Sequence, residues 1–356
     1  MAEVPITSSR KRGTRRAQGA PTVADVASLA GVSPMTVSRV VNRDRAVLPA
    51  TRERVEQAIA SLGYVPNRAA RSLAGGRQCR IALVYSNPSA SYLSELLVGA
   101  LAQANAEDAQ LLVELWEEGG TVAGLVAKLK AHHVDGVLLP SPLCEDPALL
   151  QALHARHIRI VQISPGALSS FADAVTIDDF EAARTITAHL LALGHSRIGF
   201  IAGNPAHSQS ILRRGGYERA LRDAGQEPAP DLMAEADFSY RSGFTAAERL
   251  LTLAPRPTAI FASNDDMAAA AVAAAHRRGL DVPADLSICG FDDTAIASST
   301  WPELTTIRQP IADMARKAVQ MLAAAIQGDE ESPSGQLARL PFTLVRRASD
   351  GPPPPA

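Results

Sequence analysis

The chain has 356 residues, of which 46% are hydrophobic and 20% are charged, a composition typical of a water-soluble globular protein. This length exceeds what one hydrophobic core usually supports, so two or three domains are expected. No apolar run is long enough to span a bilayer, and no apolar stretch follows the basic N-terminus as a secretory signal requires, so a cytoplasmic protein without a membrane partner is expected. Cys79, Cys144 and Cys289 lie far apart, which favours buried thiols over disulfides or a metal site.

The net charge of −2 conceals a strong asymmetry along the chain. Residues 1–77 hold 13 Arg and Lys against five Asp and Glu, a charge of +8, which leaves −10 for the remainder. A basic segment joined to an acidic body indicates a polyanionic partner for the segment. A solvated, disordered basic tail is the alternative, and it suffices for residues 1–20 but not for the patterned sequence after Pro21.

Two short helices separated by a tight turn are predicted after residue 21. The run TVAD (residues 22–25) supplies a side-chain cap at Thr22 and an acidic first turn. GVS (residues 31–33) breaks this helix, and Ser33 can cap a second helix that has Pro34 at its first position and runs to residue 42. A third helix is expected from about residue 49 to 62. This arrangement is a helix-turn-helix.

The second helix has two distinct faces. Val37, Val40 and Val41 form a stripe that should be buried. The opposite face carries, at helical spacing, Met35, Ser38, Arg39 and Asn42. The alternative for Met35 is a gap-filling core residue.

Residues 66–76, PNRAARSLAGG, form an unusual linker because they combine two arginines, small alanines and a single large apolar residue, Leu73. The segment reads as a helix of roughly two turns, too short to be stable alone in water. We therefore expect it to be helical only with a partner, which we take to be DNA. A plain flexible linker is the alternative, but Gly/Ser linkers do not carry a lone leucine beside arginines.

Taken together, TVADVASLAGVSPMTVSRVVN and LGYVPNRAARSLAGG closely resemble the LacI/GalR family of bacterial transcription regulators. The resemblance implies that Pro34, Met35 and Arg39 reach base edges in the major groove. It also implies that Leu73 wedges between base pairs in the minor groove, with Arg71 on a phosphate. The full set of expected DNA contacts is Thr22, Ser33, Pro34, Met35, Thr36, Ser38, Arg39, Asn42, Asn67, Ala70, Arg71 and Leu73.

From residue 80 onward, strands and helices alternate. Apolar runs that predict strands lie at residues 80–85, 136–139, 158–163, 175–177, 198–202, 259–262 and 286–291. Such runs between amphipathic helices indicate parallel sheets covered on both faces, with ligands bound beyond the carboxyl ends of the strands. The polar residues that follow these strands are Asn87, Ser89, Ser141, Ser164, Asp178, Asp179, Asn204, His207, Asn264, Asp266, Asp292 and Asp293.

This polar set, with Tyr92, Phe238 and Trp301 near it, suits a neutral sugar, because amides and carboxylates bind hydroxyls and rings stack on C–H faces. No glycine-rich phosphate motif occurs, and no cofactor is expected. The family resemblance continues through LGH (193–195), SND (263–265), GFDD (290–293) and LTT (304–306), and it implies that Arg213 grips ligand hydroxyls. The expected effector-binding residues are Asn87, Ser89, Tyr92, Ser141, Asp179, Arg213, Phe238, Asn264, Asp266, Asp292 and Trp301.

Several alternatives stay open. Arg213 could form a solvated pair with Arg214, Asp292 could cap a helix, and Asp178 could take the place of Asp179. The run NPSASY (residues 87–92) departs from the Asn-Pro-Phe-Phe common in the family, which leaves the identity of the sugar undecided. A sugar sensor or enzyme whose head serves for docking is the rival function, although no Ser/His/Asp arrangement or metal cluster stands out.

The expected fold is an all-α helix-turn-helix head plus hinge helix, followed by an α/β two-subdomain body with parallel sheets, like that of periplasmic binding proteins. The expected limits are a disordered tail (1–20), a DNA-binding domain (21–65), a hinge (66–77), a body (78–347) and a disordered tail (348–356). Within the body, one subdomain spans about 78–191 and 308–338, and the other about 192–307 and 339–347. The resemblance further implies a nucleoid-associated homodimer that binds a pseudo-palindromic operator. A mono- or disaccharide is expected to change its affinity for this operator.

Overall fold

The computed structural model describes residues 21–41, 47–64, 79–86, 89–116, 119–328 and 335–355. The chain divides into two compact units, residues 1–77 and residues 78–356. Each unit has its own hydrophobic core. Within the described residues, no helix is both long and apolar enough to cross a membrane.

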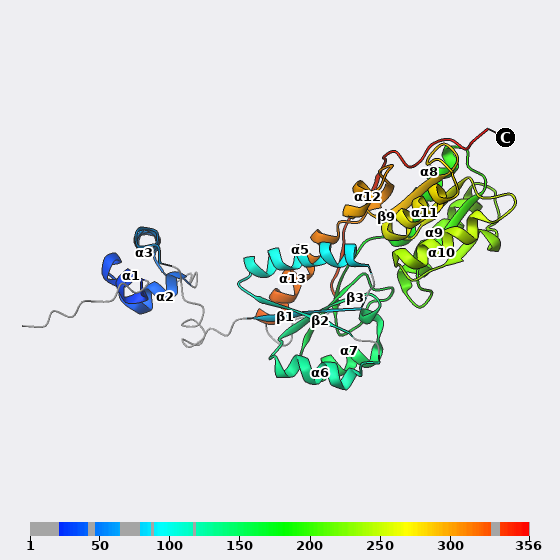
Figure 1. Ribbon diagram of the computed structural model, residues 1–356. Coiled ribbons are helices and arrows are strands. Elements are labelled where there is room, and N and C mark those ends of the chain that lie inside the picture. The colour runs from blue at the N-terminus through cyan, green and yellow to red at the C-terminus, as the bar shows by residue number, and fades with distance from the viewer. Residues whose placement is uncertain are drawn as a thin grey trace, which may run out of the picture. The chain divides into compact units, whose positions relative to one another are not determined.

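The first unit contains three helices, α1 (Val23–Ala30), α2 (Pro34–Val41) and α3 (Pro49–Leu62), which pack around a small apolar core (Figure 1). Val26, Val37 and Val55, one from each helix, are fully buried in it. All three helices were predicted from the sequence. Their short length is tolerable because each buries an apolar face against the other two.

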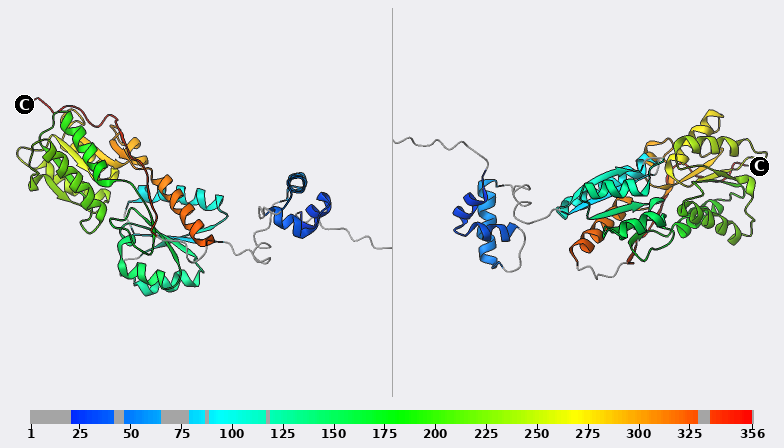
Figure 2. Two further views of the ribbon diagram at one scale, coloured as in Figure 1. Left: turned by 180° about the vertical axis from the view of Figure 1, so that it is seen from behind. Right: turned by 90° about the horizontal axis from the view of Figure 1, so that it is seen from below.

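The first half of the body is built on a parallel sheet of six strands in the order β11-β5-β4-β3-β1-β2. Figures 1 and 2 show α5 and α13 on one face of this sheet and α6 and α7 on the other. The strands are β1 (Arg80–Tyr85), β2 (Gln110–Leu115), β3 (Gly136–Pro140), β4 (Arg159–Ile163), β5 (Asp173–Thr176) and β11 (Leu337–Arg339). The helices are α5 (Ala90–Ala106), α6 (Val122–Ala131), α7 (Pro147–His154) and α13 (Ile311–Gln327), with a 3₁₀ turn η1 (Leu143–Glu145).

The second half repeats this plan with the order β12-β10-β9-β8-β6-β7, in which only β12 runs antiparallel to its neighbour. Side chains of α8 and α9 pack on one face, and those of α10 and α11 on the other. The strands are β6 (Ile198–Ala202), β7 (Met233–Glu235), β8 (Ala259–Ala262), β9 (Ser287–Asp292), β10 (Thr305–Arg308) and β12 (Thr343–Val345). The helices are α8 (Asp179–Ala192), α9 (Ser208–Asp223), α10 (Tyr240–Leu251), α11 (Asp265–Arg277) and α12 (Ala295–Ser299), with a 3₁₀ turn η2 (Pro230–Leu232).

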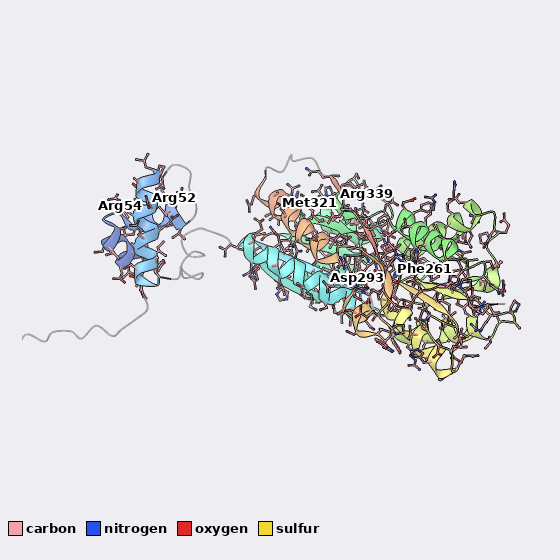
Figure 3. The ribbon with its side chains drawn as sticks, turned by 90° about the horizontal axis from the view of Figure 1, so that it is seen from above. Arg52, Arg54, Phe261, Asp293, Met321 and Arg339 are labelled. Carbon is pink, nitrogen blue, oxygen red and sulfur yellow. The ribbon has the colours of Figure 1, made fainter. Side chains whose placement is uncertain are left out.

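The chain passes between the halves three times: from β5 to α8, from β10 to α13 and from β11 to β12. The first passage was expected near residue 191, after α8, but α8 packs against α9 and so lies with the second half. Hydrophobic periodicity identifies a helix without showing which sheet it covers, which explains this error. Asp293, labelled in Figure 3, accepts hydrogen bonds from Arg308 and Arg347 at 2.6 Å each and thereby ties the end of β10 to the segment after β12.

The C-terminal segment differs from the expectation of disorder after residue 347, because it docks on the second sheet. Ser349 is fully buried; its Oγ accepts from Thr305 N at 2.9 Å and donates to Ile288 O at 2.5 Å. Ile288 N in turn donates to Ser349 O at 2.8 Å. The proline run was read correctly as non-helical, but composition could not reveal that the residues before it satisfy backbone groups of the sheet.

Candidate functional site

The start of α1 and the turn between α1 and α2 are held by local hydrogen bonds at Thr22 and Ser33, the two caps that the sequence predicted. Thr22 N donates to Asp25 Oδ2 at 2.9 Å, and Asp25 N donates to Thr22 Oγ1 at 3.4 Å, which completes a capping box. Gly31 ends α1 at φ 63°, in the left-handed region that favours glycine. Ser33 Oγ then accepts from Thr36 N at 3.1 Å and holds the first turn of α2.

The two faces of α2 differ sharply in burial. Val37 and Val40 are buried in the core of the first unit. Met35 is 66% exposed on the opposite face, where Arg39 is also exposed, so Met35 is not a core residue. An exposed, unbranched apolar side chain at the start of such a helix is available for contact with a partner.

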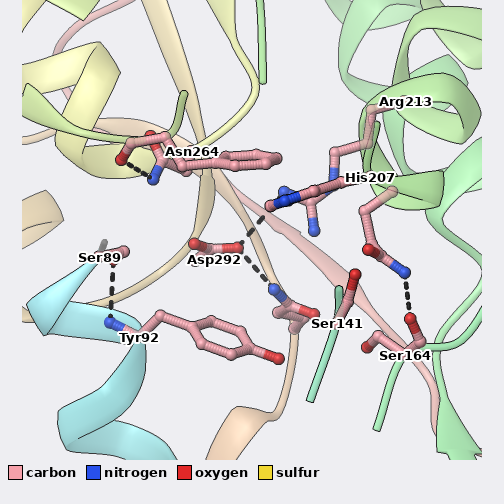
Figure 4. A pocket seen from close by; sticks show the side chains of 11 residues that line it. Ser89, Tyr92, Ser141, Ser164, His207, Arg213, Asn264 and Asp292 are labelled. Atoms are coloured by element: carbon pink, nitrogen blue, oxygen red, sulfur yellow. Dashed lines mark hydrogen bonds and ion pairs between the residues drawn. The ribbon is translucent and has the colours of Figure 1, made fainter. Parts of the chain in front are cut away.

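A pocket lies at the carboxyl ends of the strands, where the two halves of the body face each other (Figure 4). Most of the strand-end polar groups that line it were predicted to lie in this region, and Gln309, which follows β10, is the exception. We call it the cleft pocket, and its lining residues are Ser89, Tyr92, Ser141, Ser164, His207, Gln209, Arg213, Phe238, Asn264, Asp292 and Gln309.

Arg213, on α9, is the charged centre of the cleft pocket and is only 4% exposed. Its Nε and one terminal nitrogen each lie 2.9 Å from Asp179 Oδ1, and the other terminal nitrogen donates to Ser263 O at 2.5 Å. The same nitrogen lies 3.7 Å from Asp292 Oδ1, and the guanidinium carbon lies 3.6 Å from the ring centre of Phe291. A buried arginine with this many partners is a fixed part of the site, not one of a solvated pair with Arg214.

The two carboxyls beside Arg213 are both perturbed. Burial, aided by the charges of Asp266 and Asp179, raises the pKa of Asp292 to about 7, although Arg213 and a hydrogen bond from Gln309 Nε2 at 2.5 Å oppose the rise. Burial likewise raises the pKa of Asp179, against the opposing effect of Arg213. Two buried carboxyls share one cation, and a pKa of about 7 means that Asp292 is partly protonated near neutral pH, which reduces the excess negative charge of the site.

Asn264 and Phe238 form one unit. Asn264 caps α11, with Oδ1 accepting from Met267 N at 2.9 Å, while its Nδ2 donates to Phe238 O at 2.9 Å. Phe238 itself has φ 71° and stacks on His207, with 5.6 Å between ring centres. A Cβ on Gly203 would lie 2.1 Å from the Phe238 ring, so the backbone after β6 must be glycine. The amide of Asn264 therefore orients the aromatic ring.

Three of the seven non-glycine residues with positive φ in the described part of the chain line the cleft pocket. Ser164 (φ 54°), Phe238 (φ 71°) and Asp292 (φ 113°) all adopt positive φ without being glycine. Such conformations cost roughly 1–3 kcal/mol each and cluster at functional sites. The strain is an independent reason to regard this pocket as functional.

Comparisons with known proteins agree with the fold. Residues 22–67 match the model for bacterial regulatory proteins of the lacI family, and residues 187–349 match that for a periplasmic binding protein-like domain. The HTH-type transcriptional regulator CelR of Thermobifida fusca is 37% identical over 320 residues, covering 88% of this chain and 94% of CelR. The chain belongs to the LacI family.

Other LacI-family members are similarly close. The lactose operon repressor of Escherichia coli (strain K12) is 34% identical over 333 residues, covering 92% of this chain and 89% of the repressor. Among solved structures, a CelR–cellobiose complex has a TM-score of 0.70 at 34% identity, covering 92% of this chain and 99% of that one. The lac repressor dimer bound to operator and the anti-inducer ONPF has a TM-score of 0.68 at 32% identity, covering 93% and 99%. The chain is thus a DNA-binding transcription regulator.

Three predicted effector residues of this LacI-family chain lie away from the cleft pocket lining. Asp179 lies behind Arg213 and supports it. Asp266 accepts hydrogen bonds from Ser89 Oγ at 2.6 Å and Ser91 Oγ at 3.2 Å, which links the two halves at the rim. Trp301 is 83% exposed and is not among the lining residues, because it follows α12 on the surface.

Other residues fall outside the sequence list or outside the described part of the chain. Gln209 was missed because it stands in the first turn of α9 and only strand ends were searched. Gln309 directly follows β10, but residues 305–308 were not predicted to be a strand, so its end was not searched. Ser164 and His207 were noted at strand ends but not listed as site residues. The predicted residues that lie outside the described part are Asn42, Asn67, Ala70, Arg71, Leu73 and Asn87.

The cleft pocket is nearly filled by its own side chains. Its cavity volume is about 30 Å³, which holds about one water molecule. Pockets that take drug-sized ligands usually measure about 300–1,000 Å³. A sugar therefore requires the halves to move apart or the lining side chains to rotate.

Proposed function

We propose that this chain is a homodimeric, sugar-responsive repressor of a carbohydrate-use operon. A mono- or disaccharide bound between the halves of the body would change its affinity for a pseudo-palindromic operator. The observation that carries this proposal is the cleft pocket, where Arg213, Asp292 and Phe238 present a charged fork, an acceptor and a flat ring together. CelR in complex with cellobiose and the lac repressor with ONPG show relatives that bind sugars or glycosides.

For the head, we propose that α2 enters the major groove of the operator. Pro34, Met35 and Arg39 would contact base edges, since all three are exposed on α2, the first two at its start and Arg39 in its last turn. The phosphate backbone of the DNA would be contacted by Thr22, Ser33, Thr36, Ser38 and Asn42. Residues 66–77 would form the hinge, with Asn67, Ala70, Arg71 and Leu73 in or near the minor groove.

For the body, we propose that a second copy covers α5 and β2. Val98 (57% exposed) and Leu101 (48%) lie on α5, and Val113 (51%) and Leu115 (60%) on β2. Strand β2 is also an edge of its sheet, so its outer backbone groups face away from the sheet. An apolar patch beside an edge strand fits the two-fold contact of a homodimer.

We further propose that the cleft binds its ligand without catalysing a reaction of it. The relatives CelR and the lactose operon repressor are named as transcription regulators and not as enzymes, which supports this proposal. A cytoplasmic, nucleoid-associated location accompanies this role.

The test is DNA binding by the full-length protein at two salt concentrations, with and without sugars found by a thermal-shift screen. Operator and scrambled DNA are compared by fluorescence anisotropy. We expect a sequence-dependent signal that weakens steeply with salt and changes when the sugar is added. Equal binding to operator and scrambled DNA refutes the proposal, and Leu73→Gly binding with unchanged affinity and bend refutes the role of the hinge.

A further inference from the structure

A second hollow adjoins the cleft pocket near the start of α9. Its cavity volume is about 410 Å³, against about 30 Å³ for the cleft pocket. The walls are mainly apolar and include Leu150, Leu168 and Phe171, while Glu145 and Ser208 stand at its polar side. The body thus has room for a ligand next to the point where its polar groups converge.

Only a hydrogen-bonded wall separates the two spaces. On the side of the hollow, Ser208 Oγ donates to Glu145 Oε2 at 2.6 Å, and Gly166 N donates to Glu145 Oε1 at 2.7 Å. On the side of the cleft pocket, the side chain of Gln209 donates to Ser164 O, and Figure 4 shows Ser164 at this edge. Residues 164 and 166 are near neighbours on one loop, and Ser208 and Gln209 are adjacent on one helix, so the wall is one loop facing one helix end.

The wall is closely fitted but not packed by large side chains. A Cβ on Gly166 would lie 2.2 Å from Ser208 Oγ, so only glycine allows this approach. The hydroxyl of Ser208 and the amide of Gln209 can rotate away without disturbing an apolar core. A ligand hydroxyl at the same place would replace the hydrogen bonds that the rotation breaks.

The far wall of the hollow suits a flat apolar group. Leu168 is 49% exposed and Phe171 is 40% exposed. Phe171 is held in place by stacking on His154, with 4.4 Å between ring centres. Fixed, partly exposed apolar side chains beside a polar cleft lose little conformational freedom when they are covered.

We propose that the hollow is a second subsite of the effector cleft and receives the second unit of a glycoside. The first unit would be the sugar at Arg213 and Asp292, and the second would present an apolar face, as an aryl aglycone or the second ring of a disaccharide does. The proposal rests on the proposed sugar-binding function. The expected ligands are therefore disaccharides or aryl glycosides and not monosaccharides.

The test measures affinities by isothermal titration calorimetry on the full-length protein. The probes are methyl and 4-nitrophenyl glycosides of glucose, galactose and mannose in both anomeric forms, with cellobiose and lactose as disaccharides. We expect at least one 4-nitrophenyl glycoside or disaccharide to bind ten-fold or more tightly than its methyl partner. The two kinds of probe distinguish an aryl group from a second sugar ring.

Leu168→Asp places a charge on the wall of the hollow at a position exposed enough to spare the fold. It should remove the ten-fold preference while leaving methyl glycoside binding within about two-fold. Leu337→Asp, an equally exposed leucine on β11 outside the lining of the hollow, is the matched control and should change neither.

Methyl and aryl glycosides that bind equally, or a preference that survives Leu168→Asp, overturn the second subsite and leave the sugar-binding function standing. Failure of every probe to bind overturns both.

Discussion

Replacing Arg213 by alanine tests the electrostatic arrangement of the cleft pocket most directly. The substitution removes two contacts of 2.9 Å to Asp179 and the bond to Ser263 O, and it leaves Asp179 and Asp292 buried without their cation. Breaking a buried ion pair on one side costs about 3–5 kcal/mol. At about 2–4 °C per kcal/mol for a domain of this size, the melting temperature of the body should fall by roughly 10 °C at pH 8.0.

The same variant should lose less at low pH. Asp292 has a folded-state pKa of about 7, above its unfolded value, so the folded protein binds this proton first as pH falls and gains stability between about pH 7 and pH 4. Without Arg213 the pKa values of both carboxyls rise further. At low pH, each additional pKa unit increases the free energy of unfolding of the variant by about 1.4 kcal/mol relative to the wild type. The difference in melting temperature should therefore shrink by a few degrees between pH 8.0 and pH 5.5.

Differential scanning fluorimetry at the two pH values makes this measurement, with Arg214→Ala as the control. Arg214 pairs with Glu218 at 2.8 Å on the exposed side of α9, and such pairs contribute only about 0.2–1 kcal/mol. We expect Arg214→Ala to shift the melting temperature by no more than about 2–3 °C at either pH. An Arg213→Ala loss that is equally small, or that does not change with pH, refutes the reasoning. Well below its melting temperature, Arg213→Ala should still bind operator DNA and fail to respond to sugar.

Truncation after Arg347 should lower the melting temperature by roughly 10 °C or more, because it removes the three hydrogen bonds of Ser349 to the second sheet at about 1–3 kcal/mol each. Truncation after Gly351 should change the melting temperature little, and equal losses would contradict a docked C-terminal segment. Asp266→Ala should speed sugar association in stopped-flow measurements, because it removes a link between the halves. Asp266→Asn, which keeps one acceptor oxygen, should speed it less, and unchanged rates for both variants would show that the link does not limit opening. Met35→Ala should change the preferred base at one operator position in a binding selection without altering the melting temperature, and an unchanged preference would exclude base contact by this side chain.

Local signals made the head predictable. Thr22, Gly31 and Ser33 act within a few residues of themselves, and their caps and turn appear where the sequence placed them. The parallel sheets were predictable for a similar reason, since continuous apolar runs mark strands buried on both faces. The strand-end rule then brought Ser89, Ser141 and other polar residues to one pocket.

The parts that were missed depend on contacts far apart in sequence. Gln309 lies at the pocket because it follows β10, a four-residue strand that the sequence analysis did not predict, and it donates to Asp292 from the distant end of β9. Asn264 looked like a ligand donor, but its amide is divided between a helix cap and Phe238 O. Trp301 looked like a stacking ring because it follows a strand end, although a short helix carries it to the surface.

The nearly filled cleft changes what a sugar must do to act as a signal. Serine–carboxylate bonds join the halves on both sides of the pocket, Ser89 to Asp266 on one side and Ser208 to Glu145 on the other, each at 2.6 Å. A ligand can shift the equilibrium between closed and open forms only by the difference between its affinities for the two. Since the closed form has space for about one water, that form binds no sugar unless its side chains move, and the sugar must favour an arrangement with these bonds strained or broken. The strength of the two links, set by one carboxylate on each side, therefore determines how much binding free energy remains to alter the affinity for the operator.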